Sequence, residues 1–141
     1  MKRLLSVFIP FVVGIAFVGC DSTTHPTATV TGTAKSADGK PLAGCTIQFV
    51  HSNDRIPPGS AIVDKDGNYK VTAAPVGQCK VLISPPPKGD KDAQKDPTGS
   101  KMETYDWIDV PTDYMDKAKT ELSFEVKTGS NTYPVLMKTK K

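Results

Sequence analysis

The sequence is poor in the residue types from which most metal and catalytic sites are built. It has only two histidines, His25 and His51, and contains neither a His-x-x-x-His nor a Cys-x-x-Cys spacing. A Gly-x-Ser-x-Gly motif, which would present a nucleophilic serine, is also missing. The pattern Asp64-x-Asp66-Gly67 is similar to the start of a calcium loop, but no glutamate closes that loop, so turn formation explains it better. We therefore expect no enzymatic activity, no metal site and no cofactor.

Two further patterns are missing, a sustained helical period and a basic stripe with interleaved aromatic residues. From Val30 onward the chain consists of short segments in which apolar and polar residues alternate, separated by Gly, Pro and Asp. Alternation with a period of two is typical of half-buried strands, so an all-β domain is predicted. Without a basic stripe, nucleic acid is not an expected partner.

The first twenty residues have the layout of an export signal. Lys2 and Arg3 precede an apolar stretch over residues 4–18, and Cys20 follows directly after a small residue. This stretch is too short to cross a bilayer as a helix, which takes roughly 20 apolar residues. With its cysteine it resembles a bacterial lipoprotein signal, except that Phe17 stands where leucine is usual in that family.

The resemblance implies that residues 1–19 are the signal peptide and that Cys20 carries the fatty acyl chains. Two or more chains give stable anchoring, so the membrane is an expected partner. The expected location is the cell envelope, on the outer face of the cytoplasmic membrane or in the outer membrane. An ordinary secretory signal and an uncleaved anchor remain as alternatives. Without residues 1–19, 16 basic residues face 15 acidic ones in a chain of 122 residues, a size that suits one domain.

The remaining chain divides into a tether and one domain. Residues 20–28 are predicted to be the lipidated cysteine and a flexible polar tether, and residues 29–138 a seven-stranded β-sandwich. Residues 88–101 hold no large apolar side chain, so a mobile loop is predicted there. A helical turn is expected within 113–119, and Pro134 would make the last strand an edge strand or place a bulge in it. The strands are expected at 29–35, 45–50, 60–63, 68–72, 78–84, 121–127 and 132–138.

Side-chain alternation also predicts the core. Tyr69 follows a hairpin, so its ring is expected to cover the end of the sandwich while its hydroxyl stays in water. The residues expected to point inward are Ile47, Phe49, Val71, Val81, Ile83, Leu122, Phe124 and Val126.

Several motifs between residues 29 and 84 occur together in a known family. They resemble the carboxypeptidase regulatory-like domain, a transthyretin-like (prealbumin-like) or Ig-like β-sandwich. The resemblance implies an accessory folding, binding or display module and does not imply peptidase activity. The motifs are Val30-x-Gly32, Asp38-Gly39-Lys40-Pro41-Leu42-Ala43-Gly44, Ile47-x-Phe49, Asp64-x-Asp66-Gly67-x-Tyr69-x-Val71 and Gly77-x-x-x-Val81-x-Ile83.

Cys45 and Cys79 raise the question of a disulfide, which an exported chain permits. In a transthyretin-like sandwich the second and fifth strands are antiparallel neighbours. Both cysteines begin their strands, so they would lie at opposite ends of the pair, beyond the roughly 7 Å that a disulfide allows between Cα atoms. Two buried thiols are therefore the simpler interpretation, with the disulfide as the alternative.

Three aromatic residues, Tyr105, Trp107 and Tyr114, lie outside these motifs. Exposed, they would form a ligand platform for a sugar or a peptide; buried, they would close the end of the sandwich. The sequence thus predicts a non-enzymatic structural or interaction module of the envelope, with a protein or a glycan as partner. The alternative is a carbohydrate-binding module that uses these exposed aromatic residues.

Overall fold

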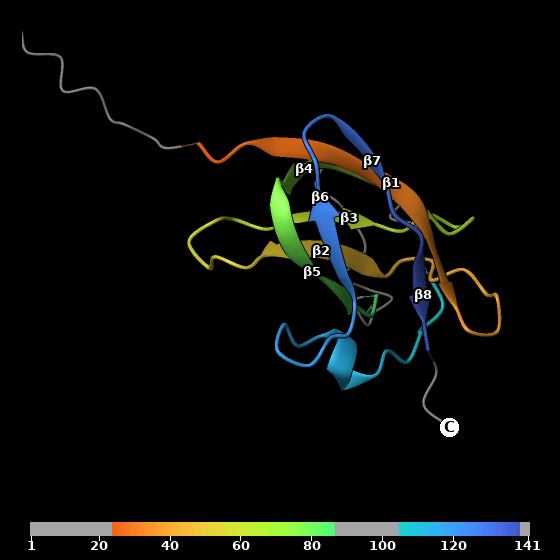
Figure 1. Ribbon diagram of the computed structural model, residues 1–141. Coiled ribbons are helices and arrows are strands. Elements are labelled where there is room, and N and C mark those ends of the chain that lie inside the picture. Colours follow the sequence, from red (N-terminus) through yellow and green to blue (C-terminus); the bar gives the residue numbers. More distant parts are fainter. Residues whose placement is uncertain (1–23, 87–104, 139–141) are drawn as a thin grey trace, which may run out of the picture.

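The structure is a computed structural model that describes residues 24–86 and 105–138 (Figure 1). The predicted signal peptide, Cys20 and the loop predicted at 88–101 lie outside the described residues. The described residues form eight strands and one short 3₁₀ helix, which are β1 (Thr27–Ser36), β2 (Thr46–His51), β3 (Gly59–Ile62), β4 (Asn68–Pro75), β5 (Gly77–Ser84), η1 (Thr112–Tyr114), β6 (Ser123–Val126), β7 (Ser130–Thr132) and β8 (Val135–Met137).

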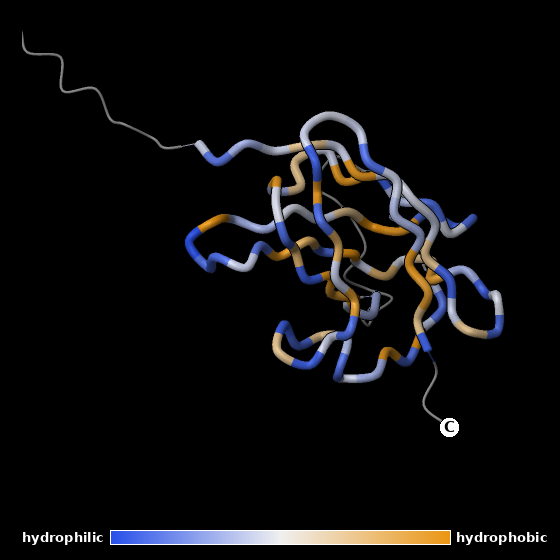
Figure 2. The backbone as a smooth tube through the Cα atoms, viewed as in Figure 1, coloured by the Kyte–Doolittle hydropathy of each residue, from blue (hydrophilic) through white to orange (hydrophobic). Residues whose placement is uncertain are grey.

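The strands form two sheets of four, so the prediction of an all-β protein is confirmed. In the first sheet β1 pairs with β4 antiparallel on one side and with both β7 and β8 in parallel on the other. The second sheet has the order β3-β2-β5-β6 and is antiparallel throughout. Figure 2 shows the hydrophobic residues concentrated in the strands, whereas the connecting loops are mostly hydrophilic.

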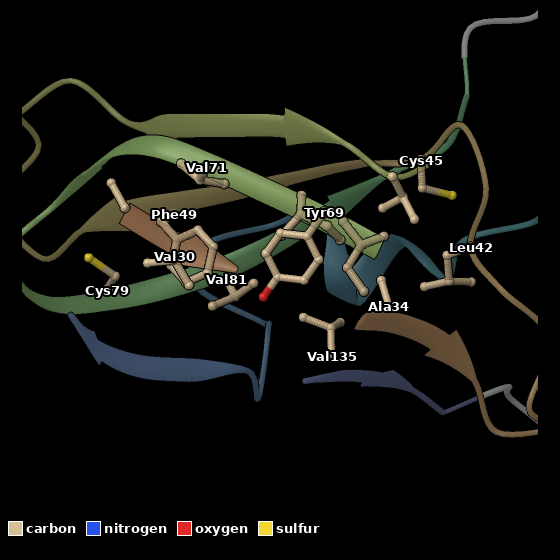
Figure 3. Packing of buried hydrophobic residues seen from close by; sticks show 14 of the residues in the cluster. Val30, Ala34, Leu42, Cys45, Phe49, Tyr69, Val71, Cys79, Val81 and Val135 are labelled. Atoms are coloured by element: carbon tan, nitrogen blue, oxygen red, sulfur yellow. The ribbon is translucent and has the colours of Figure 1, made fainter. Parts of the chain in front are cut away.

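One hydrophobic core lies between the sheets. Alternate residues of β1 and β4, such as Val30 and Val71, meet Phe49 and Val81 from the second sheet (Figure 3). Each is at most 1% exposed, as period-two alternation on a half-buried strand requires. The predicted inward positions are confirmed as fully buried in six cases, Ile47, Phe49, Val71, Val81, Ile83 and Val126, whereas Leu122 and Phe124 are only partly buried against the core.

The predicted count of seven strands is wrong because the last predicted strand is interrupted. Strands β7 and β8 occupy the range predicted as one strand, with Tyr133 and Pro134 between them. Proline has no N–H to donate to a ladder. The N–H of Tyr133, one residue earlier, still donates to the carbonyl of Thr31 at 2.9 Å. The carbonyl of Tyr133 instead turns inward, and this splits one strand into two.

The hydroxyl of Tyr69 is the donor to that carbonyl, which corrects the expectation that this hydroxyl stays in water. Tyr69 is 4% exposed, and its hydroxyl donates to the carbonyl oxygen of Tyr133. The approach is possible because Gly32 on β1 has no side chain there: a Cβ on Gly32 would overlap the Tyr133 carbonyl. The hydrogen bond therefore joins β4 to the β7–β8 break across β1.

Strand β1 begins at Thr27, inside the segment predicted to be a tether. Upstream of it, Nε2 of His25 lies 2.8 Å from the carbonyl oxygen of Val76, and the N–H of Val76 donates to the carbonyl of Pro26 at 3.0 Å. The His25 ring also packs on the ring of His51, with centroids 5.0 Å apart. Residues from His25 onward are thus held against the start of β5, although their polar composition suggested a free segment.

Candidate binding groove

A groove of about 630 Å³ lies at one end of the sandwich. It lies where β1 and β8 finish side by side, since Ser36 and Met137 are register partners. One wall comes from the loop between β1 and β2, and the other from residues 105–109. Figure 1 shows this end of β1 on the opposite side of the domain from its start.

The first wall is a turn fixed to both sheet strands by backbone hydrogen bonds. The N–H of Ser36 donates to the carbonyl of Lys40 at 2.8 Å, and the N–H of Gly39 donates back to Ser36 at 2.9 Å. The N–H of Ala37 reaches the carbonyl of Met137 at 2.8 Å. Asp38 and Lys40 are therefore presented at the solvent-exposed edge of a well-supported loop.

The second wall is the segment of residues 105–109, which is held in place by the contact of Tyr105 with Gly44. The ring of Tyr105 lies on the backbone of Gly44, where a Cβ would overlap the ring, and Gly44 has a φ of +78°, in the left-handed region that favours glycine. At the other end of the segment, Val110 is 4% exposed and packs in the core. Between these two fixed points Trp107 is 49% exposed and lines the groove.

The charged groups of the groove are unequal in number. Asp38, Asp106 and Asp109 line it together with a single basic side chain, Lys40. No group of three histidine, cysteine, aspartate or glutamate side chains in the described residues is placed to hold a metal ion, so these carboxylates do not converge on one point. The groove therefore offers hydrogen-bond acceptors from two segments of the chain.

The structure separates the three aromatic residues predicted as a ligand platform. Tyr105 and Trp107 line the groove, whereas Tyr114 lies in η1, is 9% exposed and belongs to the core. The hydroxyl of Tyr114 accepts a hydrogen bond from the backbone N–H of Lys138 at 2.9 Å. Tyr114 thus closes the sandwich next to β8, which was the structural alternative for these residues.

Cys45 and Cys79 are free, buried thiols. In the antiparallel β2–β5 pair, His51 lies opposite Cys79 and Thr46 opposite Ser84, so the two cysteines stand at opposite ends of the pair. Figure 3 shows them at the two ends of the core. Burial raises the pKa of each thiol to about 11, and Lys117 acts weakly in the opposite direction on Cys79. Neither thiol is a nucleophile at neutral pH.

The aspartate-rich hairpin between β3 and β4 is explained by turn formation. One carboxylate oxygen of Asp64 accepts hydrogen bonds from the backbone N–H groups of Asp66, at 2.9 Å, and of Asn68, at 2.7 Å. The hydrogen bond from the Asn68 N–H is the main reason why the pKa of Asp64 lies below its usual value. The carboxylate thus organises its own loop.

Four charged residues that line the groove were not predicted from the sequence as binding residues, namely Asp38, Lys40, Asp106 and Asp109. The first two belong to a segment whose Asp-Gly-Lys-Pro composition indicates a turn. Turn formation already explains these residue types, so nothing in the sequence indicated separately that they line a binding site. They meet the 105–109 segment across more than sixty residues of chain, a proximity that no local pattern reports.

The fold and the groove define an all-β protein of two packed sheets with one aromatic and acidic groove at an end. No helix in the described ranges, 24–86 and 105–138, has the length and apolar character to span a membrane. Comparison of the chain with protein-family models, with curated proteins and with solved structures found no match in any of the three.

Proposed function

We propose that this chain is a lipid-anchored, non-enzymatic interaction module of the bacterial cell envelope. Its anchor is Cys20, and its domain is a transthyretin-like sandwich of the carboxypeptidase regulatory-like type. The module binds an envelope protein or a glycan through the groove at the end of β1 and β8. The apolar stretch that precedes Cys20 and the motifs between residues 29 and 84 support this assignment.

The position of the groove relative to the start of the domain is the observation that carries the proposal. Strand β1 has ten residues, and at about 3.3 Å per residue it separates its two ends by roughly 30 Å. The groove lies at the far end of β1, beyond Ser36. An anchor ahead of β1 would therefore leave the groove directed away from the lipid surface.

The chain between the anchor and the domain is short. His25 is already held against Val76, and only residues 21–24 lie between it and Cys20. Even fully extended, that connection reaches at most roughly 18 Å. The near end of the sandwich therefore stays close to the membrane, and the groove faces the envelope space in which a partner would be met.

The chemistry of the groove favours binding over catalysis. The residues described as lining it supply carboxylates, one ammonium and aromatic rings, and none of them is a histidine or a cysteine. Their arrangement suits recognition of a ligand by stacking and hydrogen bonding.

Trp107 is the only tryptophan of the chain, which provides a direct test. The acylated protein is reconstituted into vesicles, and its fluorescence is quenched either with brominated lipid or with acrylamide in solution. The proposal predicts that acrylamide quenches Trp107 and that brominated lipid does not. A variant with Trp107→Phe and Thr27→Trp, which moves the fluorophore to the near end, is expected to show strong quenching by the lipid.

Two results would contradict the proposal. One is quenching of Trp107 by brominated lipid, because the groove would then lie at the membrane. The other is unchanged sedimentation of Cys20→Ser with vesicles, because the membrane association would then not depend on acylation. The same Cys20→Ser protein, compared with the wild type by intact mass, reports the acyl chains directly.

A further inference from the structure

We infer that the groove binds a glycan chain that carries no acidic groups, with Trp107 stacked on one sugar face and the carboxylates accepting hydrogen bonds from the sugar hydroxyls. The inference deepens the proposed function and rests on it, because it names the ligand of the same groove. The volume of about 630 Å³ lies within the range of roughly 300–1,000 Å³ typical of ligand sites.

The aromatic part of the groove supplies a flat apolar surface. Trp107 is 49% exposed, which is unusual for the largest apolar side chain, and it stands between the fixed ends of its segment. The ring of Tyr105 beside it is anchored on Gly44. Aromatic faces carry negative potential, so they attract the slightly positive C–H groups that line one face of a pyranose ring.

The polar part of the groove selects for hydrogen-bond donors. Ionised carboxylates only accept hydrogen bonds, and Asp38, Asp106 and Asp109 outnumber the one ammonium group, Lys40. A ligand that satisfies them brings several donors and no negative charge of its own. Sugar hydroxyls meet both conditions, whereas uronic acids, sulfated glycans and phosphorylated glycans would be repelled.

The spacing of the carboxylates favours a glycan over a single cationic group. Asp38 comes from the loop between β1 and β2, and Asp106 and Asp109 come from the 105–109 segment; in the described residues these carboxylates form no group of three that could hold a metal ion. A cation cage would also surround its ligand with several ring faces, but Tyr114 is buried in the core and Tyr105 is covered on the side of Gly44. Separate acceptors beside one exposed ring match a ligand with donors spaced along its length.

The test is calorimetric titration of the full acylated protein in detergent micelles with four probes. These are a neutral glucose oligomer, a neutral N-acetylglucosamine oligomer, an oligogalacturonate and a lysine-rich peptide. The inference predicts binding of at least one neutral oligomer, with an affinity that changes little between low and high salt, because no charge pair is formed. Preference for the oligogalacturonate, or binding of the peptide alone, would overturn it, and so would failure to bind either neutral oligomer.

Variants connect the binding to the groove. Trp107→Ala is expected to weaken binding of the neutral oligomer about tenfold, and Trp107→Phe to restore part of it. Asp106→Asn combined with Asp109→Asn changes two exposed side chains and is expected to weaken the same binding severalfold. The matched control is Ile62→Ala on β3, since Ile62 is 62% exposed but does not line the groove. Equal binding by the Trp107→Ala and Ile62→Ala proteins would overturn the inference.

The two proposals fail in different experiments. Absence of neutral glycan binding in a protein whose Trp107 is shielded from brominated lipid would remove the inference and leave the anchored module intact. Neutral glycan binding by a protein that sediments with vesicles independently of Cys20 would remove the lipid-anchored module and leave the glycan inference intact. Thermal unfolding of each variant, measured alongside, separates loss of a contact from loss of the fold.

Discussion

At the scale of single residues, the surroundings of a side chain decide its chemistry. Cys45 and Cys79 are at most 2% exposed, and burial raises the pKa of both thiols to about 11. Because thiolate is the reactive form, and burial in apolar surroundings disfavours it, these groups are inert. They act as small apolar side chains of the core.

We therefore predict that neither core thiol is alkylated in the folded protein. At pH 8, three units below a pKa of about 11, only roughly 0.1% of each group is thiolate. In the Cys20→Ser protein, which keeps these two cysteines alone, iodoacetamide should add no mass in buffer and two adducts in urea. Rapid labelling of the folded protein would contradict the buried placement, and a mass lower by two hydrogens before labelling would indicate a disulfide.

Tyr69 illustrates a residue whose environment was misjudged from its neighbours along the chain. A tyrosine after a hairpin commonly keeps its hydroxyl in water, yet here the hydroxyl is bonded to the carbonyl of Tyr133. The two residues are 64 positions apart. Alternation correctly predicts that Tyr69 points to the core side, but it carries no information about which distant group completes its hydrogen bond.

At the scale of elements, the break between β7 and β8 is the main departure from regular sheet structure. Pro134 cannot continue the ladder, and the Tyr133 carbonyl before it passes over Gly32 to reach Tyr69. Three elements, β1, β4 and the β7–β8 pair, are thus joined at one crossing point. The small size of residue 32 is a requirement of this crossing.

We predict that Gly32→Ala lowers the free energy of unfolding by about 2–4 kcal/mol. The estimate combines the strain of an added methyl in a packed site with the partial loss of the Tyr69 hydrogen bond. Urea denaturation of the variant and the wild type measures the difference. Lys35→Ala, an exposed position on the same strand, is the control and should change stability by less than about 0.5 kcal/mol. Equal stability of the two variants would contradict the close approach of the Tyr133 carbonyl to Gly32.

The groove is likewise a product of elements that meet only in the folded chain. Its first wall follows from turn-forming residues between β1 and β2, and its second wall needs Gly44 to seat Tyr105. Each wall is recognisable in the sequence as a loop with turn or aromatic residues. Their convergence depends on the contact of Tyr105 with Gly44, which joins the 105–109 segment to the loop between β1 and β2.

At the scale of the whole molecule, buried thiol and tyrosine groups make the stability of the fold depend on pH in the alkaline range. Burial raises the pKa of Tyr69, with a further contribution from Tyr133, and burial raises the pKa of Tyr133 as well. The two core thiols are shifted in the same direction, from 9.0 to about 11. In each case the unfolded chain loses its proton at a lower pH than the folded protein does.

We therefore predict that stability falls on the alkaline side. These groups contribute fully below their unfolded pKa values, and the contribution is lost as pH rises, first from about 9 for the thiols and then from about 10 for the tyrosines. Urea midpoints at pH 7, 9 and 10.5 should decrease in that order. Tyr69→Phe should start from a lower midpoint and lose less between pH 9 and 10.5. A midpoint that stays constant up to pH 10.5 would contradict this linkage.

Local sequence patterns are enough to specify the all-β class of this protein and most of its core residues. Apolar residues that alternate with polar ones can be buried on one side only of a strand, and Asp-Gly turns end the strands, so these local patterns specify two-sided β structure and positions such as Phe49, Val71 and Val81 as core. Strand phase predicted that Cys45 and Cys79 point inward, whereas their placement at opposite ends of one strand pair followed from the resemblance to a transthyretin-like sandwich and agrees with the β2–β5 register.

The contacts between groups far apart in the chain became known from the folded structure. It joined Tyr69 to Tyr133 over Gly32, buried Tyr114 while leaving Trp107 half exposed, and brought acidic residues of two distant segments into one groove. The physical reason is that periodicity reports which side of a strand a residue occupies, whereas the pairing of strands and the packing of loops depend on contacts between segments far apart in the chain.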